Sequence, residues 1–89
     1  MTSTKLTMRL EDGKYVYDFT ASTSKICIAA NYTHMCRLGA YLVDDKLVNK
    51  VPIGFDQGTD PVLFMNLMVG QKIRIVSEME PKAIVMQEN

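Results

Sequence analysis

The chain has 89 residues, of which 47% are hydrophobic and 22% are charged, which is the balance of one folded domain over residues 1–89. Ten basic and ten acidic residues give no net charge, which disfavours both strong nucleic-acid binders and DNA mimics. The sequence shows neither a signal-peptide core nor an apolar run of about 18 residues, so we expect a cytoplasmic protein without a membrane span.

The first 20 residues have the pattern of a β-hairpin. Asp12-Gly13 is a preferred pair for a two-residue type I′ turn, and alternating apolar and polar runs flank it. A tip at these residues places apolar side chains opposite one another in three pairs: Leu10 with Tyr15, Met8 with Tyr17 and Leu6 with Phe19. Because a shift of one residue would separate all three pairs, the pattern predicts the register as well as the hairpin.

Residues 24–39, SKICIAANYTHMCRLG, fit two structures, a pair of strands or a helix. Read as two strands, the segment turns at Asn31-Tyr32 and places Cys27 opposite Cys36, at a spacing that suits a disulfide. This interpretation is favoured because the rest of the chain is rich in hairpin patterns.

The second structure for this segment is a helix over residues 24–38. Ser24 would cap its start, the alanines favour it and Gly39 would end it. The two cysteines would then lie on opposite sides of the helix, so the state of the thiols distinguishes the two structures.

Residues 38–53, LGAYLVDDKLVNKVPI, predict a second hairpin that turns near Asp44-Asp45. Two aspartates adopt turn conformations less readily than Asn-Gly does. Two neighbouring registers bury the aliphatic side chains equally well, so the sequence leaves the pairing open.

A short helical segment is predicted near residue 61. Asp60 supplies an N-cap side chain, Pro61 suits the first helical position and Gly70 suits a helix stop. The intervening VLFMNLMV also suits a strand, and the capping residues favour the helical turn.

Two further strands complete the predicted fold. Residues 72–79, KIRIVSEM, alternate isoleucines with basic residues, and residues 82–87, KAIVMQ, follow a break at Pro81. The sequence therefore predicts an all-β fold, a small antiparallel sandwich or barrel of about six to eight strands with one short helical segment. An α+β fold with the helix over residues 24–38 is the alternative.

Patterns for catalysis and metal binding are weak. His34 and Cys36 are spaced like a base and a nucleophile on one strand face, but no third group or family signature accompanies them. The two cysteines and the single histidine lack the paired spacing of a zinc site, and neither a phosphate-binding glycine loop nor a calcium loop occurs. We therefore expect no enzymatic activity, no catalytic residue, no metal ion and no cofactor.

The leading hypothesis is a small non-enzymatic protein that binds another macromolecule, as an inhibitor or accessory factor, and self-associates. A chain this short buries a limited core, and association is one way to cover its remaining apolar surface. The predicted partner-binding residues lie in two polar stretches: Tyr32, His34 and Arg37 in the first, and Asp56 and Asp60 in the second.

Two other functions are weaker hypotheses. A small-ligand or nucleotide-binding module would use Arg37, Lys72 or Arg74 to hold an anion at a subunit interface. Binding of single-stranded nucleic acid would need stacking tyrosines, but the first hairpin places two of the four tyrosines on its buried face. The zero net charge also disfavours it.

Overall fold

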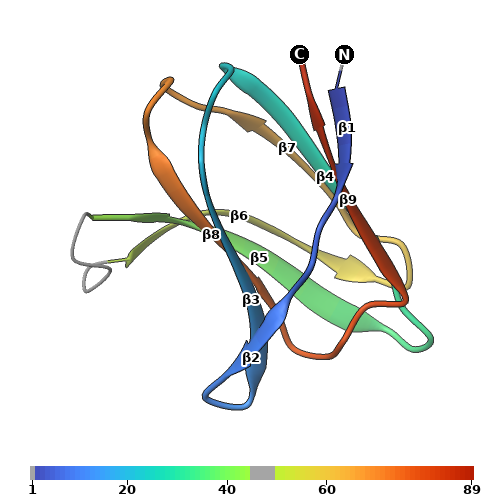
Figure 1. Ribbon diagram of the computed structural model, residues 1–89. Helices are drawn as coiled ribbons and strands as arrows, with labels where there is room; N and C mark the ends of the chain where they lie inside the picture. The colour runs from blue at the N-terminus through green and yellow to red at the C-terminus, as the bar shows by residue number, and fades with distance from the viewer. Residues whose placement is uncertain (1, 45–49) are drawn as a thin grey trace.

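Two antiparallel β-sheets form a sandwich in the computed structural model, which describes residues 2–44 and 50–89. The described residues contain nine strands and no helix. Figure 1 shows one sheet across the top of the view, with both chain ends beside it, and the other sheet below. The predicted all-β sandwich is confirmed, whereas the short helical segment and the alternative helix over residues 24–38 are wrong.

The two sheets take their strands from separate parts of the chain. Sheet A contains, in spatial order, β1 (Thr2–Lys5), β9 (Ala83–Glu88), β4 (Lys25–Asn31) and β7 (Val62–Asn66). Sheet B contains β2 (Arg9–Glu11), β3 (Lys14–Thr20), β8 (Lys72–Ser77), β5 (Cys36–Val43) and β6 (Lys50–Gly58). Strands β8 and β9 lie where the sequence predicts them.

The core lies between the sheets because each strand turns alternate side chains inward. Ile28 of sheet A and Leu38, Ile73 and Ile75 of sheet B are fully buried, each with 0% exposure. Full burial of one such side chain stabilises the folded state by roughly 1.5–3 kcal/mol. The outer face of each sheet is consequently free to carry polar or exposed residues.

The first hairpin is confirmed at its tip but is shorter than predicted. Asp12 and Gly13 have φ of 52° and 78°, as a type I′ turn requires, and Leu10 pairs with Tyr15. The two remaining predicted pairs, Met8 with Tyr17 and Leu6 with Phe19, do not form. The chain instead crosses to sheet A, where the Leu6 N–H donates to the Ile84 carbonyl oxygen at 3.0 Å and the Leu6 side chain enters the core.

Residues 24–39 form strands, but the predicted hairpin between them is wrong. β4 lies between β9 and β7 in sheet A, whereas β5 lies between β8 and β6 in sheet B. Each strand thereby gains two neighbours, which a two-stranded hairpin does not provide. Cys27 and Cys36 consequently lie in different sheets, and both are free thiols.

The second hairpin is confirmed as the pairing of β5 with β6. Val43 pairs with Lys50 at the end of this ladder, and the predicted turn at Asp44-Asp45 falls at the edge of the described residues. Asp45 itself lies outside the described residues. The register shifts between Ala40 and Tyr41, as in a β-bulge.

The predicted helix near residue 61 is a strand, β7. Leu63 and Met65 point into the core while Phe64 and Asn66 are exposed, which is the period of two that a strand shows. Instead of capping a helix, Asp60 accepts a hydrogen bond from the side chain of Asn31. Across residues 2–44 and 50–89 there is no apolar helix of the length that a bilayer crossing requires.

The separation of the two thiols predicts their reactivity. Cys36 is buried in the core and Cys27 is only partly buried on sheet A, so a thiol reagent should modify Cys27 in the native state and Cys36 only after unfolding. Mass spectrometry of the labelled chain checks this, with Cys27→Ser as the control that abolishes native labelling. An intramolecular disulfide, or equal rates at both thiols, would contradict the two-sheet arrangement.

Candidate functional site

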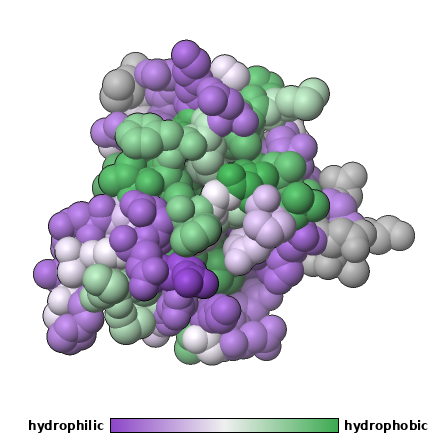
Figure 2. Space-filling view, turned by 180° about the vertical axis from the view of Figure 1, so that it is seen from behind, coloured by the Kyte–Doolittle hydropathy of each residue, from purple (hydrophilic) through white to green (hydrophobic). Residues whose placement is uncertain are grey.

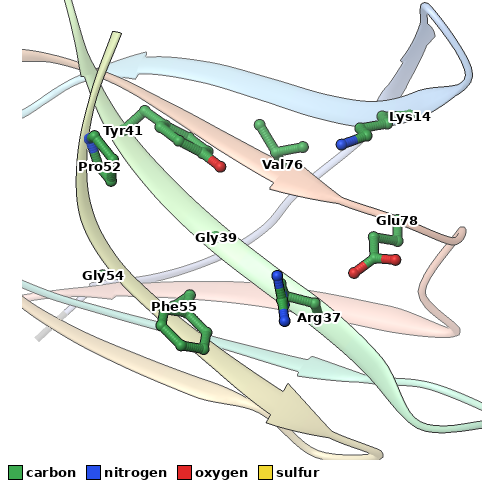
Figure 3. Close-up of a pocket in the computed structure, with 9 residues that line it drawn as sticks. All are labelled: Lys14, Arg37, Gly39, Tyr41, Pro52, Gly54, Phe55, Val76 and Glu78. Carbon is green, nitrogen blue, oxygen red and sulfur yellow. The ribbon is translucent and has the colours of Figure 1, made fainter.

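A pocket of about 330 Å³ opens on the outer face of sheet B. Its lining comes from β3, β5, β6 and β8 and from Glu78, and Figure 3 shows these side chains above the sheet. Gly39 of β5 forms part of the floor, where the ring of Tyr41 lies beside it. A Cβ atom at Gly39 would lie 3.4 Å from the Tyr41 ring, so the ring packs directly over this residue.

The polar groups of the pocket come from different strands. In Figure 3 the Lys14 amine and the Tyr41 hydroxyl point toward each other from opposite sides of Val76. Arg37 and Glu78 lie together on another side of the pocket. An apolar floor with two cations, one carboxylate and one hydroxyl around it fits a polar group that carries a negative charge.

An exposed aromatic ring stands at the edge of this pocket. The Arg37 guanidinium carbon lies 5.3 Å from the centroid of the Phe55 ring, a cation–π contact, and Phe55 is 67% exposed. Met35 is 68% exposed, and its sulfur accepts a hydrogen bond from Gln57 at 3.7 Å. We call these four residues and the adjoining pocket the Arg37–Phe55 surface.

An ion-pair network supports the same face of sheet B. The buried Arg74 donates from Nε and Nη2 to the two carboxylate oxygens of Asp18 at 2.8 and 3.0 Å. Arg9 donates to the same carboxylate at 2.8 Å, and Glu11 lies 3.6 Å from Arg74. Hydrogen bonds from Arg74, and then from Arg9, hold the pKa of Asp18 below its ordinary value. Tyr41, which lines the pocket, pairs with Arg74 across the strands, so the network lies beside the pocket on the same face.

The structure places Tyr32, one of the predicted partner-binding residues, inside the molecule and out of a partner's reach. Tyr32 continues the inward positions of β4 and is 2% exposed, and its N–H donates to the Thr59 carbonyl oxygen at 2.8 Å. Its hydroxyl lies 2.6 Å from the Ser77 hydroxyl. Burial raises the pKa of Tyr32 to about 12. Tyr32 therefore joins the two sheets and does not enter the candidate surface.

The other predicted residues lie in three places. His34 is exposed in the connection before β5, and Arg37 is exposed on sheet B. The Asp56 carboxylate accepts hydrogen bonds from the N–H groups of Val62 and Gln57, both at 2.9 Å, which lower its pKa. Asp56 and Asp60 thus both bond within the protein, around the β6–β7 connection, and neither lines the pocket.

Sequence reasoning found Arg37 but missed its neighbours Phe55 and Tyr41. The alternation of Arg37, Gly39 and Tyr41 with buried residues indicates that these three share the outer face, and this signal was present in the sequence. The place of Phe55 depends on its pairing with Gly39 next to a bulge, which no local pattern reveals.

Comparisons with known proteins do not add a function. No protein-family model, curated protein or solved structure matches the chain. Within the described residues, no group of three or more histidine, cysteine, aspartate or glutamate side chains is placed to hold a metal ion. The candidate site is therefore interpreted from its own geometry.

The ion-pair network predicts an acid-sensitive contribution to stability. Asp18→Asn should lower the free energy of unfolding at pH 7 by about 3 kcal/mol, because it leaves the buried Arg74 charge without its carboxylate. Since the folded pKa of Asp18 is lowered, its contribution is complete above about pH 4 and is lost as the pH falls through the folded pKa. Urea unfolding across this pH range measures both effects.

Glu11→Gln is the matched control for Asp18→Asn, because Glu11 belongs to the same network but its side chain is 42% exposed. We expect this control to change stability by less than about 1 kcal/mol. Equal losses for the two variants, or a loss for Asp18→Asn that is as large at pH 2 as at pH 7, would contradict the assigned role.

The buried Tyr32 hydroxyl predicts a loss of stability at alkaline pH, whereas Asp18 predicts a loss at acid pH. Tyr32→Phe should cost about 1 kcal/mol at pH 7, because it removes the hydrogen bond with Ser77. In the unsubstituted protein the free energy of unfolding should fall as the pH rises from about 10 to 12, since the folded pKa is raised. Urea unfolding should show a weaker fall for Tyr32→Phe. A Tyr15→Phe variant that lost as much stability would show that the effect is not specific.

Proposed function

We propose that this protein is a small non-enzymatic protein-binding module, of the inhibitor or accessory type, that contacts its partner through the Arg37–Phe55 surface. The observation that carries the proposal is the exposed Phe55 ring, stacked against Arg37 beside a preformed pocket. Aromatic residues, methionine and arginine are the residue types most enriched in protein interfaces. His34, the remaining exposed residue of the first predicted stretch, lies in the β4–β5 connection next to Met35 in the chain.

The contact between Arg37 and Phe55 also favours binding energetically. A guanidinium that already rests on a ring loses less conformational freedom when a partner binds than an unrestrained side chain does. The outer face of sheet B is held by its strand pairs and by the Arg74 network, so the pocket keeps its shape. A partner can therefore dock without reordering this face.

The charges around the pocket indicate the chemistry of the partner. Lys14 and Arg37 are cationic and Glu78 is anionic, so the lining carries one excess positive charge. A planar carboxylate can accept two hydrogen bonds from one guanidinium. The surface therefore suits a protein that places an acidic side chain in the pocket and an apolar contact on Phe55.

Binding of a small anion or nucleotide is the second candidate function, and it would use the same two cations. Arg74 does not contribute to it, because Asp18 and Glu11 already compensate its charge. Lys72 does not line the pocket. The volume of about 330 Å³ lies at the lower end of the range for small-molecule sites, which is why the protein partner is preferred.

Affinity capture from a lysate of the source cells tests the proposal. The unsubstituted protein should retain a discrete partner, and both Arg37→Ala and Phe55→Ala should reduce its recovery at least about tenfold, the effect of losing one interface anchor. Lys5→Ala, an exposed change on sheet A, is the matched control and should retain the partner. Circular dichroism confirms that each variant is folded.

Two results would count against a protein partner. The first is recovery that neither Arg37→Ala nor Phe55→Ala changes. The second is a rise in melting temperature with a nucleotide or another small anion that disappears in Arg37→Ala, without any captured protein. The second result would support the small-anion function instead.

A further inference from the structure

Strand β7 leaves one side of its backbone unpaired at the edge of sheet A. It pairs with β4 alone among the described strands. Just beyond its two ends, the Leu67 N–H donates to Ser24 at 2.7 Å, and the Pro61 carbonyl oxygen accepts from Ala30 at 3.1 Å. Backbone direction alternates along an antiparallel strand, so the N–H and C=O groups of Phe64 and Asn66 point to the open side.

This edge lacks the usual protection against a further strand. Natural edge strands carry lysine, proline or a bulge that discourages pairing, but residues 62–71, VLFMNLMVGQ, contain no charged residue and no proline. Three apolar side chains of this segment are widely exposed: Phe64 at 82%, Met68 at 79% and Val69 at 68%. Strand β7 exposes Phe64, and the turn that follows it exposes Met68 and Val69, so the edge and the adjoining turn present an uncharged, mostly apolar surface.

A mostly apolar groove of about 240 Å³, whose lining also includes Asn66 and Gln71, runs beside this edge. Leu42 of β5 and Ile53 of β6 line it together with Phe64, Leu67 and Met68. Figure 2 shows apolar side chains in a broken green band across the middle of the molecule, between hydrophilic regions above and below. A strand added to β7 would turn alternate side chains toward this groove.

We propose that the occupant of this edge is a second copy of the same chain, with the two β7 strands antiparallel about a twofold axis. The edge requires an extended, uncharged, apolar strand with its own free backbone groups, and β7 of a second copy has each of these properties. Residues 62–71 themselves carry no charge, so no like charges face each other along the two β7 strands, and the Asp56 carboxylate beside this edge is already bound to the Val62 N–H. Pairing through the same patch on both copies gives a closed dimer.

The hydrogen bond from the Val62 N–H to Asp56 favours one register for the proposed pairing of the two β7 strands. The Val62 N–H is already bound by the Asp56 carboxylate at 2.9 Å, so Phe64 and Asn66 are the residues of β7 with both backbone groups free on the open side. Both residues are fully used when Phe64 of each copy pairs with Asn66 of the other. Met65 then faces Met65 across the axis, and the two Phe64 rings become diagonal neighbours within reach of each other.

Analytical ultracentrifugation of the full chain tests the dimer with a matched pair of variants. Phe64→Lys should weaken dimerisation at least tenfold, because it places two positive charges near the axis. Phe55→Lys makes the same change at an exposed phenylalanine of sheet B and should leave the dimer intact. A chain that stays monomeric at all concentrations up to the limit of solubility would overturn the proposal. Equal weakening by the two variants would also overturn it.

Amide hydrogen exchange in the unsubstituted protein is a second test, which does not depend on a variant that folds. The amides of Phe64 and Asn66 should exchange at least tenfold more slowly at concentrations where the dimer forms. Exchange at these two amides that does not change between monomer and dimer would overturn the proposed pairing. The dimer does not rest on the proposed function: Phe64→Lys should still capture the Arg37-dependent partner, so the two proposals fail separately.

Discussion

The structure depends on one constraint, that the inner faces of two sheets must bury each other. Ile28, Leu38, Ile73 and Ile75 meet in that layer and are fully withdrawn from water. A chain of this length fills one such layer and no more. The path of the N-terminal segment and the position of Tyr32 follow from which side chains this layer accepts.

Sheet B shows how an outer face becomes a framework for a site. Its polar network joins β2, β3 and β8 through Arg74 and Asp18, although this face is not part of the apolar core. The register shift in β5 and the absence of a side chain at Gly39 then shape a depression beside that network. The pocket therefore forms where the pairing of β5 with β6 is irregular, and the candidate binding side chains lie around the rim of the pocket.

Much of the local structure could be predicted from the sequence, because it depends on neighbours along the chain. The Asp12-Gly13 turn and the alternation of Ile73 and Ile75 are of this kind. The partners of β4 and of β5 in their sheets could not all be predicted, since these two strands are adjacent in sequence but join different sheets. The segment after Asp60-Pro61 misled the prediction because the same residues that cap a helix also precede a strand.

The candidate site, like the fold, has parts that the sequence predicts and parts that it does not. Arg37 could be predicted from its residue type and its place in a polar stretch. Its contact with Phe55 could not, because it depends on a pairing of β5 with β6 that two registers satisfied equally well. The burial of Tyr32 could not be predicted, because it depends on the opposite sheet, where the Ser77 hydroxyl lies 2.6 Å from the Tyr32 hydroxyl.

The pairing of β1 with β9 places the two ends of the chain side by side, with Thr2 opposite Glu88. Figure 1 shows both ends leaving the molecule at the same corner. β1 and β7 form opposite edges of sheet A, and the pocket lies on the other sheet. An affinity tag or a fused fluorescent protein at either end would therefore project away from both surfaces. A short peptide joining the two ends, with new ends opened in a surface loop, would give a circularly permuted chain with the same spatial order of strands.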